Sequence, residues 1–189
     1  MKYVRRFLWF IASKLLIFSA IASVLVLAFY LAMNTANIYL LLNDGMQLRT
    51  SVILTREGSA GLPNFFANDF LDSDEALKAG MSSQSPYVNY RITSFESDVK
   101  LEWVWSWPWE DIARARMVHT VPEIKGTIRP EKSALVQSGA LSSNPPVWNG
   151  GRYEMVLHRV NGQWKIAGMR QTQIIAPKAT PVPTPVPAP

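Results

Sequence analysis

The chain contains no cysteine, which excludes a disulfide framework, a thiolate zinc site and a cysteine nucleophile. It has only two histidines, His119 and His158, whereas a metal site needs at least three convergent ligands. The segment Trp-Asn-Gly-Gly-Arg (residues 148–152) lacks the spacing and the following helix of a phosphate-binding loop. No Asn-x-Ser/Thr sequon occurs, which disfavours a glycosylating secretory route. We therefore expect neither a metal nor a nucleotide, and no cofactor.

Acidic residues are missing from the first part of the chain. Before Asp44 the only charged residues are Lys2, Arg5, Arg6 and Lys14. From Asp44 onward the remaining 15 basic residues are almost balanced by 14 acidic ones, although the whole chain carries a net charge of +5. The basic excess thus flanks one end instead of forming a basic patch, so nucleic acid is not expected as a partner.

A long apolar run follows the basic flank. Residues 15–33, LLIFSAIASVLVLAFYLAM, would span about 28 Å as a helix, close to the hydrocarbon thickness of a bilayer. The alternative is a cleaved signal peptide, but the run is long for one and no small-x-small cleavage site follows it. We predict a single transmembrane helix over residues 15–35, with Trp9 at the interface. The basic residues of the 1–14 flank predict a cytoplasmic N-terminus and an extracytoplasmic C-terminal domain at the cell membrane.

Helical spacing continues beyond the membrane. An apolar stripe recurs every three or four residues, although Asn43-Asp44-Gly45 could instead be a turn that ends the first helix; the stripe consists of Ile38, Leu41, Gly45, Leu48 and Val52. We expect the helix to continue or to restart there.

Two short helices are predicted in GLPNFFANDFLDSDEALKAG. Pro63 suits a first helical position, and Asp72 with Glu75 resembles a capping box for a second helix that Gly80 can close. An apolar face is supplied by Phe65, Phe66 and Phe70. Such brief amphipathic helices need a sheet to pack against.

The rest of the chain alternates at period two and predicts antiparallel strands in YVNYRITSF, SDVKLEWVWSW and IARARMVHTV. The strongest local signal is Asn161-Gly162, which suits a two-residue type I′ hairpin turn. That turn fixes which residues face one another across the two strands. On the expected core side the pairs are Arg159 with Trp164, Leu157 with Ile166 and Tyr153 with Arg170. On the opposite side they are His158 with Lys165 and Glu154 with Met169.

The order of a long helix, a helix pair and antiparallel strands, with "FFANDFL" and "GRYEMVLHRVNGQWKIAGM", resembles the nuclear transport factor 2-like superfamily. The resemblance covers residues 36–175 and implies an α+β fold, in which helices pack on a curved, mostly antiparallel sheet to form a cone. It also implies kinship with membrane-anchored assembly proteins of bacterial conjugation and secretion channels, whose cones make protein contacts. Residues 176–189, which are rich in proline, are expected to form a disordered tail.

The most unusual feature is LEWVWSWPWED. Trp103, Trp105, Trp107 and Trp109 occupy alternate positions, so in a regular strand they share one side with Val99 and Leu101. The more ordinary interpretation is a heavily aromatic core whose outer rings touch the bilayer or a second subunit. The alternative is an aromatic-lined surface that binds a partner, a polymer or a lipid-like ligand. Pro108 predicts that the strand ends or bulges there, leaving Trp107 and Trp109 as the more exposed pair.

Trp148 is a fifth candidate for the binding surface. It lies in the poorly patterned stretch between residues 130 and 152, and connections of this length are usually functional or mobile.

Candidate acids or bases inside the cone are Asp98, Asp111, His119 and Tyr90, but their spacing forms no recognisable constellation. We therefore expect a membrane-tethered, non-enzymatic scaffold or accessory subunit of an envelope complex, which contacts a protein partner or a second copy of itself. A Trp-lined pocket for an apolar or sugar-like ligand is the second hypothesis, and a cone-type enzyme is the third.

Overall fold

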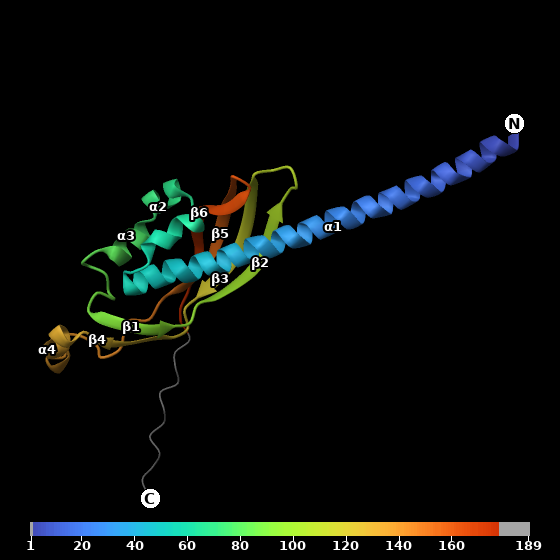
Figure 1. Cartoon of the computed structure of the whole chain (residues 1–189). Helices are drawn as coiled ribbons and strands as arrows, with labels where there is room; N and C mark the ends of the chain where they lie inside the picture. Colours follow the sequence, from blue (N-terminus) through green and yellow to red (C-terminus); the bar gives the residue numbers. More distant parts are fainter. Residues whose placement is uncertain (1, 178–189) are drawn as a thin grey trace, which may run out of the picture.

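The computed structural model describes residues 2–177 and has an α+β fold, as predicted. A single helix, α1 (Lys2–Thr55), extends away from a small domain of short helices and two antiparallel sheets and then continues into it (Figure 1). The uninterrupted α1 confirms that the helix continues through Asn43-Asp44-Gly45. Most of the predicted proline-rich tail lies outside the described residues.

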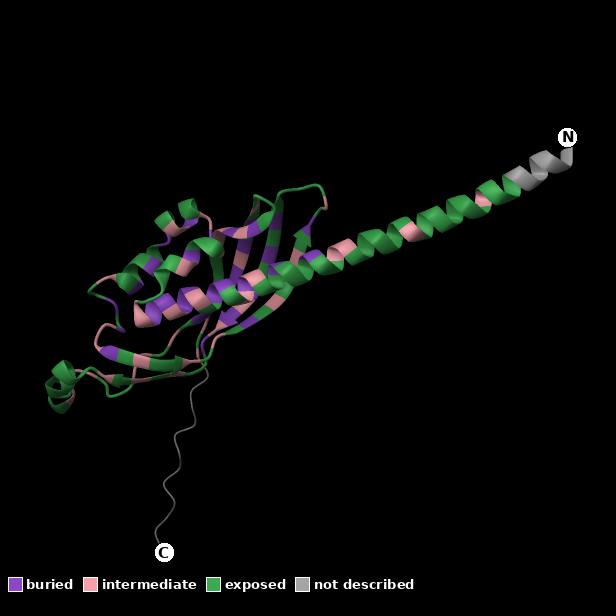
Figure 2. Ribbon diagram, viewed as in Figure 1, coloured by how far each residue is buried: buried purple, intermediate pink, exposed green. Residues whose placement is uncertain are grey.

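The two halves of α1 differ in their surroundings. It is long and apolar enough to cross a membrane, and none of its most apolar stretch is buried. Figure 2 shows this exposed part as the half that extends away from the domain. Contact with the domain begins at the half-buried Tyr30 and the buried Asn34. Beyond these residues, Ile38, Leu42 and Met46 are fully buried against the sheet, so one continuous helix joins both parts.

Where two short helices were predicted, the structure has two short α-helices preceded by a 3₁₀ helix. Pro63 lies inside a 3₁₀ helix, η1 (Ser59–Asn64), and not at the start of α2 (Asn68–Ser73). The cap of α3 (Glu75–Met81) is Asp74, which accepts a hydrogen bond from the backbone N–H of Leu77 at 3.1 Å. The prediction that Asp72 begins a capping box is therefore wrong, because the N-cap of the helix is Asp74, two residues later. The acidic run Asp72-Ser73-Asp74-Glu75 offers more than one capping side chain, and packing selects the one that faces α1.

The larger sheet has the strand order β2-β3-β5-β6, and α1 packs across its inner face. Its strands are β2 (Asp98–Ser106), β3 (Ile112–Thr120), β5 (Gly150–Val160) and β6 (Gln163–Ile175). A separate ribbon pairs β1 (Tyr90–Phe95) with β4 (Ile124–Ile128), a strand that the sequence pattern did not predict. All pairings between these strands are antiparallel.

The Asn161-Gly162 turn is confirmed, since both residues have positive φ, 50° and 80°. Next to the turn, Arg159 pairs with Trp164 and Leu157 with Ile166, as predicted. Farther along, a register shift at Ala167 places Glu154 opposite Arg170 and Tyr153 opposite Gln171. The predicted pairs Glu154–Met169 and Tyr153–Arg170 are therefore wrong, because a β-bulge adds one residue to β6.

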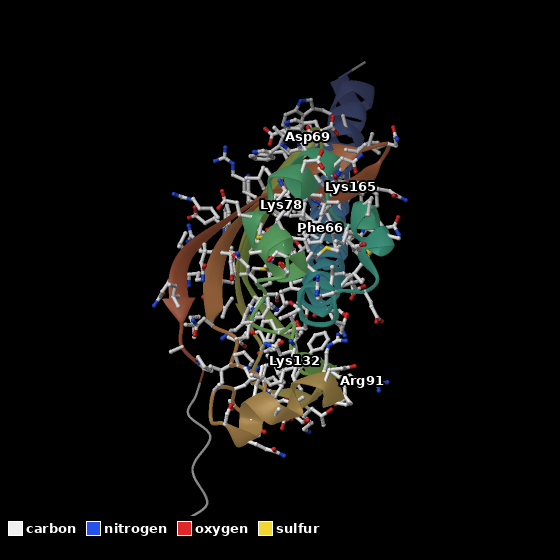
Figure 3. All side chains as sticks on the ribbon, turned by 90° about the vertical axis from the view of Figure 1, so that its left-hand side faces the viewer. Phe66, Asp69, Lys78, Arg91, Lys132 and Lys165 are labelled. Carbon is white, nitrogen blue, oxygen red and sulfur yellow. The ribbon has the colours of Figure 1, made fainter. Side chains whose placement is uncertain are left out.

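The ribbon of β1 and β4 lies at the end of the domain farthest from the N-terminus. The same end carries a 3₁₀ helix, η2 (Pro130–Lys132), and α4 (Ser133–Gln137) (Figure 1). Figure 3 views the domain from that end, with Phe66 near its centre and Arg91 and Lys132 in the β1–β4 and α4 region. The buried residues that pack with Phe66 come from α1 (Leu42), α2 (Phe70) and the sheet (Ile166), so the core lies between these elements.

Candidate interaction site on the outer face of the sheet

A β-bulge in β2 decides where the tryptophans point. Leu101 pairs with Met117, but the next pair is Trp103 with Arg116, so Glu102 is the extra residue. Because side chains alternate along a strand, one extra residue exchanges the two faces. Trp103 and Trp105 therefore lie on the face opposite Val99 and Leu101. The prediction that all of them share one side is wrong.

All four tryptophans of LEWVWSWPWED are partly or largely exposed: Trp103 by 47%, Trp105 by 45%, Trp107 by 37% and Trp109 by 73%. The interpretation as a heavily aromatic core is therefore wrong, and the core instead receives Val104 and the buried Ser106. The rings contact one another, with Trp105 and Trp107 edge to face at 5.1 Å and Trp107 and Trp109 stacked at 5.0 Å. Such pairs add about 0.5–1.5 kcal/mol beyond area burial and stabilise the cluster in water.

Arginines from β3 lie directly opposite the strand tryptophans. Arg116 pairs with Trp103 and Arg114 with Trp105, and Glu154 of β5 follows opposite Arg116. We call this surface the outer sheet face; it consists of Trp103, Trp105, Arg114, Arg116, Glu154 and Arg170. The Glu154 carboxylate lies 3.5 Å from Arg116 and accepts a hydrogen bond from Arg170. These hydrogen bonds, Arg170 first and Arg116 after it, lower the pKa of Glu154.

The outer sheet face is hollowed in two places. One hollow of about 520 Å³ is lined by Trp103, Arg116, Glu154 and Gly168 among others. A second hollow of about 620 Å³ adjoins it at Trp103 and extends to Trp107 and Asp111. The surface therefore combines aromatic walls, cations and one carboxylate; tryptophan and arginine are enriched at the centres of protein interfaces, whereas glutamate is depleted there.

The turn after β2 contacts α1. β2 ends at Ser106, which confirms that the strand stops before Pro108. The prediction that Trp107 and Trp109 are the more exposed pair is wrong for Trp107, which is the least exposed of the four because its ring packs against those of Trp105 and Trp109. The carbonyl oxygen of Pro108 accepts a hydrogen bond from the hydroxyl of Tyr30 at 3.4 Å, and that hydroxyl accepts one from Arg159 at 3.2 Å. Four residues along α1, the Asn34 amide donates to the Ser106 hydroxyl and accepts from the indole N–H of Trp164 at 2.8 Å. These bonds attach the sheet to α1 at residues 30–34.

Trp148 does not belong to this surface. It is half-buried, packs against the core, and its ring lies 6.4 Å from the rings of both Tyr87 and His119. The fold thus brings four of the five predicted tryptophans together and places the fifth in a structural position.

The interior contains an ion pair that the sequence pattern did not single out. Arg49 of α1 donates to both carboxylate oxygens of Asp74, at 2.6 and 2.8 Å, and both side chains are only 4% exposed. Burial alone would raise the pKa of Asp74, but the hydrogen bonds and charge of Arg49 hold it below its usual value. An arginine within an apolar helical stripe was the available signal, but its partner could not be identified before the fold was known.

The four candidate acids and bases are not brought together. Asp98 and Asp111 are exposed at opposite ends of the β2–β3 pair, and the Tyr90 hydroxyl donates to the carbonyl of Ser142 at 2.9 Å. His119 is fully buried, and burial, with the nearby charge of Arg49, lowers its pKa to about 4. Its Nε2 lies 3.0 Å from the hydroxyl of Ser97. The hydroxyls of Ser97 and Thr50 lie beside this imidazole, and its burial favours the neutral form.

Within residues 2–177 no three His, Asp or Glu side chains converge in a way that could hold a metal ion. No protein-family model, curated protein or solved structure matches the chain.

Proposed function

We propose that the protein is a membrane-tethered, non-enzymatic scaffold or accessory subunit of an envelope complex, and that the outer sheet face binds its protein partner. The observation that carries the proposal is the bulge at Glu102, which turns Trp103 and Trp105 out of the core and beside Arg114 and Arg116. Tryptophan and arginine are the residues most enriched among those that dominate binding energy at interfaces. A surface of this composition on a small domain is typical of a contact with another protein.

The membrane anchor in this proposal is residues 15–35, with the N-terminus in the cytoplasm and the domain outside. The exposed apolar half of α1 supports this anchor, because an apolar helix surface of this length is unfavourable in water and favourable in a bilayer. The contacts of Tyr30 with Pro108 and Arg159 favour an uncleaved anchor, because cleavage after the apolar run (residues 15–33) would remove Tyr30.

The order of a long helix, two short helices and a sheet that ends in a hairpin supports a nuclear transport factor 2-like cone. In this cone, the space between α1 and the sheet is filled by side chains such as Met117, Met155 and Leu157, each of which is at most 1% exposed. The filled interior favours a protein contact on the outside over a ligand or substrate held inside.

Binding of a sugar-like ligand on the tryptophans is less well supported. A sugar stacks on a free aromatic face, whereas Trp107 and Trp109 stack on each other. The hollow beside Trp103 is the place where a small apolar ligand would bind, and a ligand screen by thermal shift tests that alternative.

The test of the scaffold is in-cell crosslinking followed by purification in mild detergent. The double variant Trp103→Ala/Trp105→Ala is expected to lose the crosslinked partner at a temperature where its unfolding curve shows it still folded; the midpoint itself falls, because each side chain is about half buried and Trp105 contacts Trp107. Val147→Ala, at another exposed apolar position, is the matched control and is expected to keep the partner. Retention of the partner by the double variant would refute the proposed surface.

Orientation is tested with a cysteine, because the chain has none of its own. Lys132→Cys places one thiol on the exposed end of the domain. A membrane-impermeant maleimide should label it in cells or spheroplasts with an intact inner membrane. Labelling only after that membrane is permeabilised would place the domain in the cytoplasm.

A further inference from the structure

The turn between β2 and β3, residues 107–111, is held at a defined level of α1. Tyr30 bonds to the carbonyl of Pro108, and Asn34 bonds to Ser106 at the end of β2. Arg159 strengthens this attachment, since its side chain donates to the Tyr30 hydroxyl and its backbone N–H donates to the carbonyl of Asp111 at 2.8 Å. The turn therefore cannot move along the helix without breaking these bonds.

That level coincides with the end of the apolar, exposed part of α1. Residues 9–29 are almost all exposed, and Phe29, the last of them, is 69% exposed. At about 1.5 Å per residue this stretch is about 30 Å long, which matches the hydrocarbon thickness of a bilayer, and Lys14 lies about 8 Å from its cytoplasmic end, where a long lysine side chain reaches back to the interface. Its end at Phe29 and Tyr30 then lies at the hydrocarbon boundary. The predicted span of residues 15–35 would instead place Tyr30 and the turn about 8 Å inside the hydrocarbon, so the level of the turn favours a span that ends at residues 29–30 over the predicted one.

The chemistry of the turn suits the headgroup layer. Trp109 is the most exposed tryptophan of the domain at 73%, and it stacks on Trp107. Tryptophan is enriched at membrane interfaces, where its ring meets the acyl boundary and its N–H meets water and headgroups. The exposed carboxylates of Glu110 and Asp111 prevent deeper entry, because a charge in the hydrocarbon is costly.

We infer that the β2–β3 turn rests in the headgroup region of the outer leaflet, with Trp107 and Trp109 as interfacial anchors. The domain then has a fixed tilt on the membrane, and Trp103 and Trp105 lie farther along β2, away from the lipid and available to a protein partner. This inference rests on the proposed membrane anchor, because it takes its depth from α1.

The test uses the full chain in phosphatidylcholine nanodiscs, with single cysteines introduced and labelled with an environment-sensitive fluorophore. Trp109→Cys reports the turn, Phe29→Cys reports the anchor, and Lys132→Cys at the far end of the domain is the matched control. Glu110→Cys repeats the measurement at the turn with every tryptophan retained. Quenching is compared between lipids that carry a nitroxide on the headgroup and lipids that carry it on the acyl chain.

We expect headgroup nitroxides to quench labels at 109 and 110 several-fold more than the label at 132, and acyl-chain nitroxides to quench the label at 29. If positions 109 and 110 behave like position 132 while 29 is quenched, the anchor holds and the inference about the turn is overturned. If position 29 is not quenched, the proposed anchor fails and the inference falls with it.

Discussion

The buried ion pair between Arg49 and Asp74 allows a quantitative test of how α1 is held in the domain. Arg49 comes from α1, whereas Asp74 caps α3, so the pair joins elements that are distant in sequence. Arg49→Met removes the guanidinium and keeps an unbranched side chain of similar length. The Asp74 carboxylate is then left buried without its countercharge.

The expected cost follows from the burial of both groups. Removing one partner of a buried ion pair typically destabilises a protein by about 3–5 kcal/mol, and with both side chains 4% exposed we expect Arg49→Met to fall in that range. Asp74→Asn should also be costly, because it leaves the Arg49 charge unpaired although asparagine can still cap α3. The double variant Arg49→Met/Asp74→Asn should lose about 2 kcal/mol or less, because no buried charge remains.

The measurement is denaturant unfolding of the full chain in mild detergent, followed by tryptophan fluorescence. In the wild type the lowered pKa of Asp74 contributes stability that is present above about pH 4 and is lost as the pH falls through the folded-state pKa. In Arg49→Met the pKa of Asp74 rises, because burial raises it and only the backbone hydrogen bonds from Leu77 and Ala76 still lower it, so the deficit shrinks on acidification. A single-variant cost below about 1 kcal/mol, or a double variant equal to the sum of the singles, would refute this reasoning.

Three further predictions concern packing and protonation. Gly80→Ala should cost about 1–3 kcal/mol, because its Cβ would lie 2.7 Å from the Ile53 Cγ2 atom where α3 meets α1. The lowered pKa of His119, about 4 against 6.5, should give stability that is complete above about pH 6.5 and falls by about 3 kcal/mol as the pH drops to about 4. Asn34→Ala should cost about 1–3 kcal/mol for each buried group left unpaired, the Trp164 indole N–H among them. The free energy of unfolding is measured with denaturant in each case, and over a range of pH for His119.

Each of these predictions has a control. Gly168→Ala, whose Cβ would meet Val156 at an ordinary 3.5 Å, should change stability by less than Gly80→Ala, and an equal cost would contradict the packing argument. His119→Gln should flatten the pH dependence between 4 and 6.5, and an unchanged slope would assign it to another group. Thr35→Ala alters an exposed neighbour of Asn34, and a loss as large as that of Asn34→Ala would contradict the role of the buried amide.

How the sequence relates to the structure is clearest in the hairpin of β5 and β6. The Asn161-Gly162 turn and the pairs beside it were predictable, because positive φ at both turn residues is a local requirement. The pairs beyond Ala167 were not, because the bulge there is chosen by how the strand curves over the core. Likewise Asp74 was one of several acidic residues able to cap α3, and packing against Arg49 selected it.

The sequence by itself determined the long helix, the α+β class, most of the strands and the location of the excess charge. These depend on run length, alternation and turn chemistry, which act over a few residues. Only the tertiary structure decided which side of the sheet holds Trp103 and Trp105, and at which level of α1 the turn with Trp107 and Trp109 lies. The first depends on the single extra residue at Glu102, and the second on hydrogen bonds from Tyr30 and Asn34 to residues more than 70 positions away. Neither has a local signature, because both are set by how the sheet curves and packs against the helix.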